Sequence, residues 1–154
     1  MEPKDKIVVF ESKQVRRIWH NEEWWFAVVD VIDVLTESSN PSVYWRVLKK
    51  RLLDEGSNQT VTKCNGLKLK AADGKMRVTD CANTETLFRI IQSIPSPKAE
   101  PFKQWLAKVG YERIQEIENP ELAAIRAREY YQALGHFLQI YLYFWIRMKN
   151  LRMA

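Results

Sequence analysis

The chain has 154 residues, of which 46% are hydrophobic and 28% charged, and it contains two cysteines and two histidines. This length and composition are typical of a soluble globular protein with one core-forming domain and an extension, and so few Cys and His residues argue against a zinc site. The formal charge of +5 is concentrated in the middle of the chain, where residues 42–77 hold nine Lys/Arg and three Asp/Glu. Clustered positive charge favours a polyanionic partner.

The N-terminal part of the sequence predicts three strands, over residues 7–11, 15–19 and 24–27. A polar turn, His20-Asn21-Glu22-Glu23, separates the last two.

A pair of helices is predicted over residues 28–53. The first has its apolar residues at helical spacing, at Val28, Val31, Ile32 and Leu35. The second begins at Pro41, with Asn40 as its N-cap. We expect Tyr44, Val47, Leu48 and Leu52 to point inward, and Arg46, Lys49 and Lys50 to share another face. Helix, short turn and basic helix form the outline of a helix-turn-helix that could enter a DNA groove, but an ordinary two-helix corner with a solvated charged face has the same pattern.

A β-hairpin is predicted around Asp73-Gly74, because this dipeptide between alternating runs is a strong hairpin signal. With Asp73-Gly74 as a two-residue loop, Lys70 pairs with Arg77, and the strands separate into a cationic and an apolar face. The cations Lys68, Lys70, Lys75 and Arg77 then point one way, and Leu67, Leu69, Ala71, Met76 and Val78 the other. A Lys-rich edge can merely prevent aggregation. Beside a basic helix, however, four cations on one face predict a wing that lies along phosphates.

Helical stripes follow in the second half of the chain. After Asn83 as a cap, we expect one buried stripe of Leu87, Ile90, Ile91 and Ile94 and a second of Phe102, Trp105, Leu106 and Val109. Gly110 is expected to end the second helix, a short helix over 114–118 follows, and a long one begins at Glu121. The apolar run 137–146 is too short to span a bilayer. It fits packing against a second copy of the chain better than a membrane-surface helix.

No arrangement of residues predicts catalysis or a cofactor. The five glycines are scattered, so there is no phosphate loop, and neither His20 nor His136 has a nucleophile in an obvious motif beside it. Asp30, Asp33 and Glu37 could gather a metal, but acids in a first helix are more often dipole partners and solvated surface. We therefore expect no enzyme, no cofactor and no metal.

Six stretches together resemble one family. They are IVVFES, WWFAVVDVIDVL, SSNPSVYWRVLKKRL, LKLKAADGKMRVTD, TETLFRIIQSI and SPKAEPFKQWLAKVGYERIQEIENPE. Over residues 6–121 the chain resembles the Bro-N family, the N-terminal domain of baculovirus BRO proteins and of many phage and prophage antirepressors. The resemblance implies an α+β domain that binds single- or double-stranded DNA with weak sequence information. In phages it implies an antirepressor with a separate C-terminal module. The chain departs from the family after ELAAIRAREYYQALG, where we interpret the tail as truncated or frame-altered.

We therefore predict an α+β fold in which a small antiparallel sheet packs with several short helices, including a helix-turn-helix-like pair. Residues 1–120 are expected to form the DNA-binding domain, and residues 121–154 a C-terminal helical arm that dimerises the chain. The expected DNA contacts are Arg46, Lys49, Lys50 and Arg51 on the helix and Lys68, Lys70, Lys75 and Arg77 on the hairpin. Arg51 leans toward the buried stripe. The alternative is a module that binds a repressor protein without touching DNA. With no signal peptide, we expect the chain in the bacterial cytoplasm at the nucleoid, with free thiols.

Overall fold

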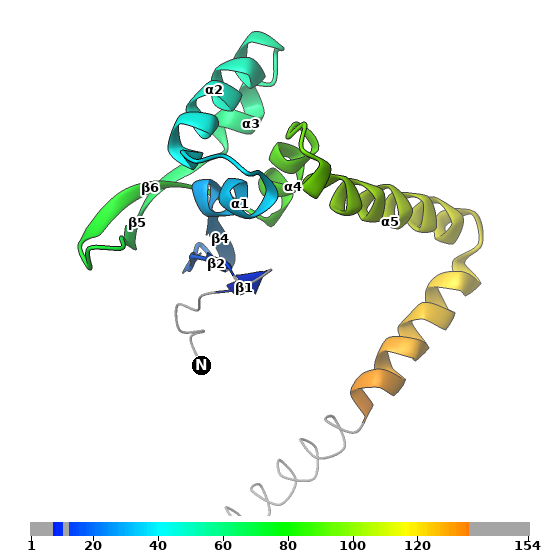
Figure 1. Cartoon of the computed structure of the whole chain (residues 1–154). Helices are drawn as coiled ribbons and strands as arrows, with labels where there is room; N and C mark the ends of the chain where they lie inside the picture. The colour runs from blue at the N-terminus through cyan, green and yellow to red at the C-terminus, as the bar shows by residue number, and fades with distance from the viewer. Residues whose placement is uncertain (1–7, 11–12, 136–154) are drawn as a thin grey trace, which may run out of the picture. The chain divides into compact units, whose positions relative to one another are not determined.

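The structure is a computed structural model, and it describes residues 8–10 and 13–135. The chain divides into two compact units, Met1–Gln104 and Trp105–Ala154. Unit 1 contains the described strands and the helices α1 to α4, in the predicted α+β arrangement (Figure 1). The expected boundary after residue 120 stays a prediction.

The N-terminal strands form two separate antiparallel hairpins. β1 (Val8–Phe10) pairs with β2 (Lys13–Val15), and β3 (Arg17–His20) pairs with β4 (Glu23–Ala27) in a second sheet of order β3-β4-β6-β5. The single strand expected over 15–19 is therefore wrong, because the chain changes sheet at Arg16. The backbone N–H and the guanidinium of Arg16 both donate to Asp30, at 2.9 and 2.7 Å. That N–H therefore cannot join a strand ladder.

The predicted helix pair is confirmed as α1 (Val28–Leu35) and α2 (Pro41–Asp54). The Asn40 side chain accepts a hydrogen bond from the Val43 N–H at 3.2 Å, as an N-cap should. The inward row of α2 is Trp45, Leu48 and Leu52, whereas Val47 is 63% exposed. The expected stripe is thus rotated toward Trp45, because this large ring buries more apolar area than a valine can.

The predicted hairpin is present, but its register is shifted. α3 (Asn58–Thr62) leads into β5 (Asn65–Lys70), which pairs with β6 (Met76–Asn83) so that Lys70 lies opposite Met76. The loop is Ala72-Asp73-Gly74, closed by the Ala71 N–H bonded to the Lys75 carbonyl at 2.8 Å. Gly74 has φ of +83°, whereas the φ of Asp73 is not positive. A two-residue loop of the expected type needs positive φ at both positions, and one left-handed glycine closes a three-residue loop instead.

The main core of unit 1 lies between the helices and one face of the four-stranded sheet. Ala82 and Phe26, which pair across β6 and β4, join the apolar residues of α1, α2 and α4 in one cluster. α4 (Thr84–Gln92) begins at the predicted cap, where Asn83 accepts from the Thr86 N–H at 3.0 Å. Its expected stripe, Leu87, Ile90, Ile91 and Ile94, is buried. The opposite face of the sheet carries a smaller cluster, Trp25, Ala27, Leu69 and Cys81.

After the short 3-10 helix η1 (Pro97–Ala99), α5 (Glu100–Glu118) passes through Gly110. The expected stop at Gly110 and the separate helix over 114–118 are therefore wrong. Gly110 has a helical backbone, and the helix ends only before Asn119-Pro120. Trp105 and Val109, expected in a core, are exposed.

Unit 2 continues from α5 into a second helix, over 120–135. The Arg126 guanidinium donates to Glu116 Oε2 at 2.7 Å and so joins this helix to α5. Large apolar side chains are exposed along both helices, among them Ile114, Ile117, Leu122 and Ile125. The run 137–146 lies outside the described residues. None of the described helices is both long and apolar enough to cross a membrane.

Candidate nucleic-acid interface

The register of the β5–β6 hairpin decides which cations share a face. Residues directly opposite each other in an antiparallel pair project to the same side, and successive residues alternate. Lys68 lies opposite Val78, and Lys70 opposite Met76, whereas Leu69 lies opposite Arg77. The expected face of four cations is therefore wrong. Lys68 and Lys70 lie on one face with Met76 and Val78, and Lys75 and Arg77 lie on the other with Leu67 and Leu69.

Contacts with α2 show that Lys68 and Lys70 lie on the face of the hairpin that is turned toward this helix. Asp80 of β6 accepts hydrogen bonds from Trp45 Nε1 at 2.8 Å and from Lys49 Nζ at 3.0 Å, both on α2. Asp80, Val78 and Met76 alternate along one strand and so point to the same side. We call the surface formed by Lys68, Lys70, Met76 and Val78 the helix-side face of the hairpin. Figure 1 shows α2 above the base of β6, with the hairpin projecting beyond it.

The opposite face of the hairpin is partly closed by the protein itself. Leu69 is buried there with Cys81, Trp25 and Ala27. Toward the tip, Arg77 forms an ion pair with Asp73 at 2.6 Å. Asp73 also accepts from the Lys75 N–H at 3.0 Å. The hydrogen bond from Arg77 and the one from the Lys75 backbone hold the pKa of Asp73 below its usual value. Arg77, one of the two cations of this face, is thus already paired with an acid of the turn.

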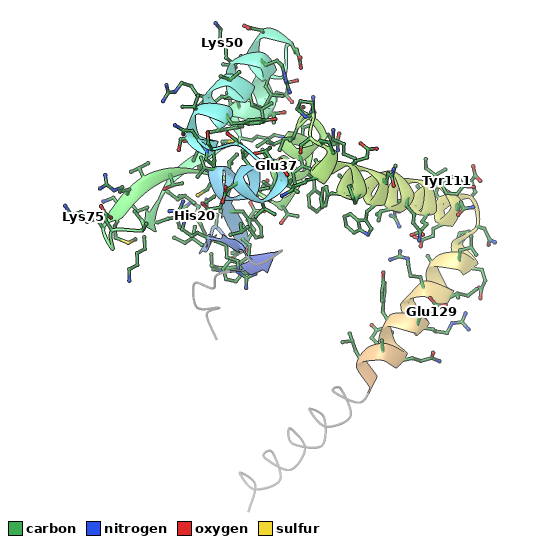
Figure 2. All side chains as sticks on the ribbon, in the orientation of Figure 1. His20, Glu37, Lys50, Lys75, Tyr111 and Glu129 are labelled. Carbon is green, nitrogen blue, oxygen red and sulfur yellow. The ribbon has the colours of Figure 1, made fainter. Side chains whose placement is uncertain are left out.

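The four predicted cations of α2 have different surroundings. Arg46 and Lys50 are exposed, and within the described ranges no ion pair or side-chain hydrogen bond is found for either. Lys49 is bound to Asp80. Arg51 donates to the Ser93 carbonyl at the end of α4 and lies 3.8 Å from Glu55. Arg51 therefore joins α2 to α4. Figure 2 shows Lys50 on α2 and Lys75 at the tip of the hairpin, well apart.

Asp80 connects the two basic elements, α2 and the β5–β6 hairpin. Burial raises its pKa, but the hydrogen bonds from Trp45 and Lys49 and the Lys49 charge outweigh burial, so the pKa of Asp80 lies below its usual value. The carboxylate is therefore ionised at neutral pH and holds Lys49 against the base of the hairpin. No pattern in the sequence indicates this contact, because Lys49 and Asp80 are distant along the chain.

The acidic residues of the first helix and the two cysteines were the other groups considered in the sequence. Asp30 is bound by Arg16, and no group of three His, Cys, Asp or Glu side chains that could hold a metal occurs within 8–10 and 13–135. Both cysteines are free thiols. Burial raises the pKa of Cys64 and of Cys81 to about 11, so neither is a thiolate at neutral pH.

The comparisons with known proteins agree with this architecture. A family model described as the BRO family, N-terminal domain, matches residues 14–116, more than half of the chain. The chain belongs to the BRO family. The Bro-N match includes α1, α2, the β5–β6 hairpin and most of α5. Neither the curated proteins nor the solved structures contain a match to this Bro-N chain.

Proposed function

We propose that this Bro-N chain is the DNA-binding domain of a phage or prophage antirepressor-type protein that acts in transcription regulation. One observation carries the proposal. The basic face of α2 and the helix-side face of the hairpin meet at the contact between Lys49 and Asp80. Two segments that are separate in the sequence thereby offer cations toward one polyanion.

The proposed roles follow from exposure and from existing partners. Lys50, Lys68 and Lys70 are exposed and would hold phosphates. Arg46 is the candidate for a base edge, because a guanidinium can bind guanine with two hydrogen bonds. Lys49 and Arg51 act mainly within the fold. Lys75 and Arg77 lie on the opposite face, and we assign them a smaller share of the affinity.

Fluorescence anisotropy with labelled duplex and single-stranded oligonucleotides at two salt concentrations tests the proposal. Neutralising Arg46, Lys50, Lys68 and Lys70 to Gln together should nearly abolish binding at moderate salt, since phosphate contacts dominate affinity. The matched control neutralises four other exposed cations, Lys98, Lys108, Arg113 and Arg128. The control has the same net charge and should keep most of the affinity. Equal loss in both variants would mean that net charge alone explains binding.

The alternative function is a protein-interaction module that binds a repressor without contacting DNA. A groove of about 490 Å³ favours it, because Val43, Tyr44 and Val47 of α2 line this groove together with Pro95. Val43 and Val47 are exposed. This alternative predicts no retention of the wild-type chain on bare oligonucleotides at any salt concentration. It also predicts that Val47→Asp, which leaves the cations intact, abolishes repressor binding.

We also propose that the chain forms a homodimer through its C-terminal helix. The exposed apolar side chains of α5 and of the 120–135 helix support this proposal, because burying them against a second copy would remove apolar area from water. Sedimentation should show a dimer at micromolar concentration. A monomer at that concentration would contradict the proposal.

A further inference from the structure

We infer that the hairpin enters a groove of duplex DNA by its helix-side face alone, with Met76 and Val78 in contact with sugars and base edges between phosphates held by Lys68 and Lys70. The inference rests on the proposed function and makes it specific. It assigns a non-ionic part of the affinity to two apolar residues, and it excludes Lys75 and Arg77 from the groove.

The first step is the unusual exposure of two apolar side chains. Met76 is 61% and Val78 68% exposed, although the opposite face of the same two strands has a buried leucine, Leu69. Met76 and Val78 therefore contribute little to the core, unlike Ala82 at the other end of the same face of β6. An exposed apolar pair on a projecting hairpin is typical of a contact surface.

The second step is the charge around this pair. Val78 lies opposite Lys68, and Met76 opposite Lys70. The Cβ atoms of such directly opposed residues are about 5 Å apart. Both lysines belong to β5, one of the two edge strands of the sheet. The only acid that β5 and β6 carry on this face is Asp80, which is already bound by Lys49 and Trp45. These two strands therefore present an apolar strip with cations along it and no free carboxylate on the helix-side face.

The third step is the shape of the partner. A Lys side chain is longer than Val or Met, so its ammonium group reaches outward while the apolar atoms stay nearer the strands. A partner that fits has anionic rims and less polar surface between them, as a DNA groove has. The major groove of B-DNA admits a two-stranded β-ribbon. Apolar side chains of other DNA-binding proteins contact thymine methyl groups or wedge between base steps.

Three double variants of the full chain separate the two faces and the two kinds of contact. They are Lys68→Gln with Lys70→Gln, Lys75→Gln with Arg77→Gln, and Met76→Gln with Val78→Thr. The first two remove the same charge from the same hairpin, so each is the matched control of the other. The third keeps side-chain size and charge. Since all six side chains are solvent-exposed and only the Arg77 ion pair is lost among them, thermal melting should show all three variants folded.

Duplex binding is then measured from low to high salt. The slope of log affinity against log salt is negative, and each lost phosphate contact makes it shallower by about 0.9. We expect Lys68→Gln with Lys70→Gln to make the slope shallower by nearly twice this amount. Lys75→Gln with Arg77→Gln should leave the slope nearly unchanged. Met76→Gln with Val78→Thr should lower affinity about tenfold at every salt concentration with the slope unchanged, as removal of about 1.4 kcal/mol of non-ionic contact would.

Three results would overturn the inference while leaving the proposed function in place. They are a larger loss from Lys75→Gln with Arg77→Gln, wild-type affinity in Met76→Gln with Val78→Thr, and tighter binding of a single strand than of the duplex of the same sequence. Absence of wild-type binding to any oligonucleotide would overturn the proposed function itself, and the inference with it.

Discussion

At the scale of single residues, Asp80 decides how the basic surface is assembled. Its carboxylate receives the Trp45 indole N–H and the Lys49 ammonium from α2, and both bonds connect this helix to β6. Without the acid, the Trp45 N–H and the Lys49 charge would face the base of the hairpin with no acceptor. An acid within a cationic surface thus holds α2 and Lys49 against β6.

The first prediction concerns Asp80→Asn. We expect the free energy of unfolding at neutral pH to fall by about 1 kcal/mol, because the amide keeps the hydrogen-bond geometry but loses the charge. Urea denaturation followed by Trp fluorescence measures the change.

The same variant should change the dependence of stability on pH. The pKa of Asp80 in the folded chain lies below that of an unfolded Asp. Its contribution is therefore complete above the unfolded pKa of about 3.9 and is lost as the pH falls through the folded pKa. Wild type and Asp80→Asn should thus converge in strong acid. Asp73→Asn, at an exposed ion pair in the turn, serves as the comparison and should lower the neutral-pH midpoint less than Asp80→Asn does, because solvent screens the exposed pair.

The second prediction separates two arginines of one helix. Arg51→Gln removes the bonds to Ser93 and Glu55, so we expect it to lower the urea midpoint and to change DNA affinity little. Arg46→Gln removes an exposed guanidinium and should lower DNA affinity without changing the midpoint. The two variants share the substitution, the charge change and the helix, so each controls for the other. A loss of affinity from Arg51→Gln equal to that from Arg46→Gln would place Arg51 at the DNA.

At the scale of elements, the loop of the β5–β6 hairpin determines which side chains share each face of the hairpin. Ala72-Asp73-Gly74 turns the chain with one left-handed residue, Gly74, and this loop fixes the pairing of Lys70 with Met76. A shift of one residue in the register exchanges the faces of one strand relative to the other. The cations therefore divide two and two between the faces, and Met76 and Val78 join Lys68 and Lys70.

The third prediction tests this loop. Gly74→Ala should lower the free energy of unfolding by about 1 kcal/mol, because a side chain disfavours φ of +83° even where space is open. Gly110→Ala is the control in α5, where a Cβ also meets nothing within 4 Å but the backbone is helical. This second substitution should increase helix stability, by up to about 1 kcal/mol. Circular dichroism during thermal unfolding measures both.

At the scale of the whole molecule, the two units differ in what they bury. Unit 1 has a continuous core between α1, α2, α4 and the sheet. In the described part of unit 2, the residue of α5 that is buried is Glu116, held by Arg126, while apolar side chains face solvent. So much exposed apolar surface on these two helices supports the proposed contact with another protein chain.

The fourth prediction tests whether that partner is a second copy of the chain. Ile117→Glu places a charge in the exposed apolar surface of α5 and should convert a sedimenting dimer into a monomer at micromolar concentration, because an unpaired charge is costly in an interface. Gln115→Glu makes the same change in charge on another side of the helix and should leave the dimer intact. Dissociation by both variants, or by neither, would contradict an interface at Ile117.

The sequence by itself determined the family, the α+β class, the helix pair with its Asn40 cap, the Asn83 cap and the stripe of α4, because each depends on residues close together along the chain. Only the tertiary structure decided which cations act together. The register of the hairpin depended on the backbone angle of Asp73, and the choice between its two faces depended on a contact between Lys49 and Asp80. Side-chain alternation predicts which residues share a face only once the pairing is known, and long-range contacts leave no periodic signal in the sequence. The eight cations were visible in the sequence, but their division between exposed, ion-paired and opposite-face positions followed from packing.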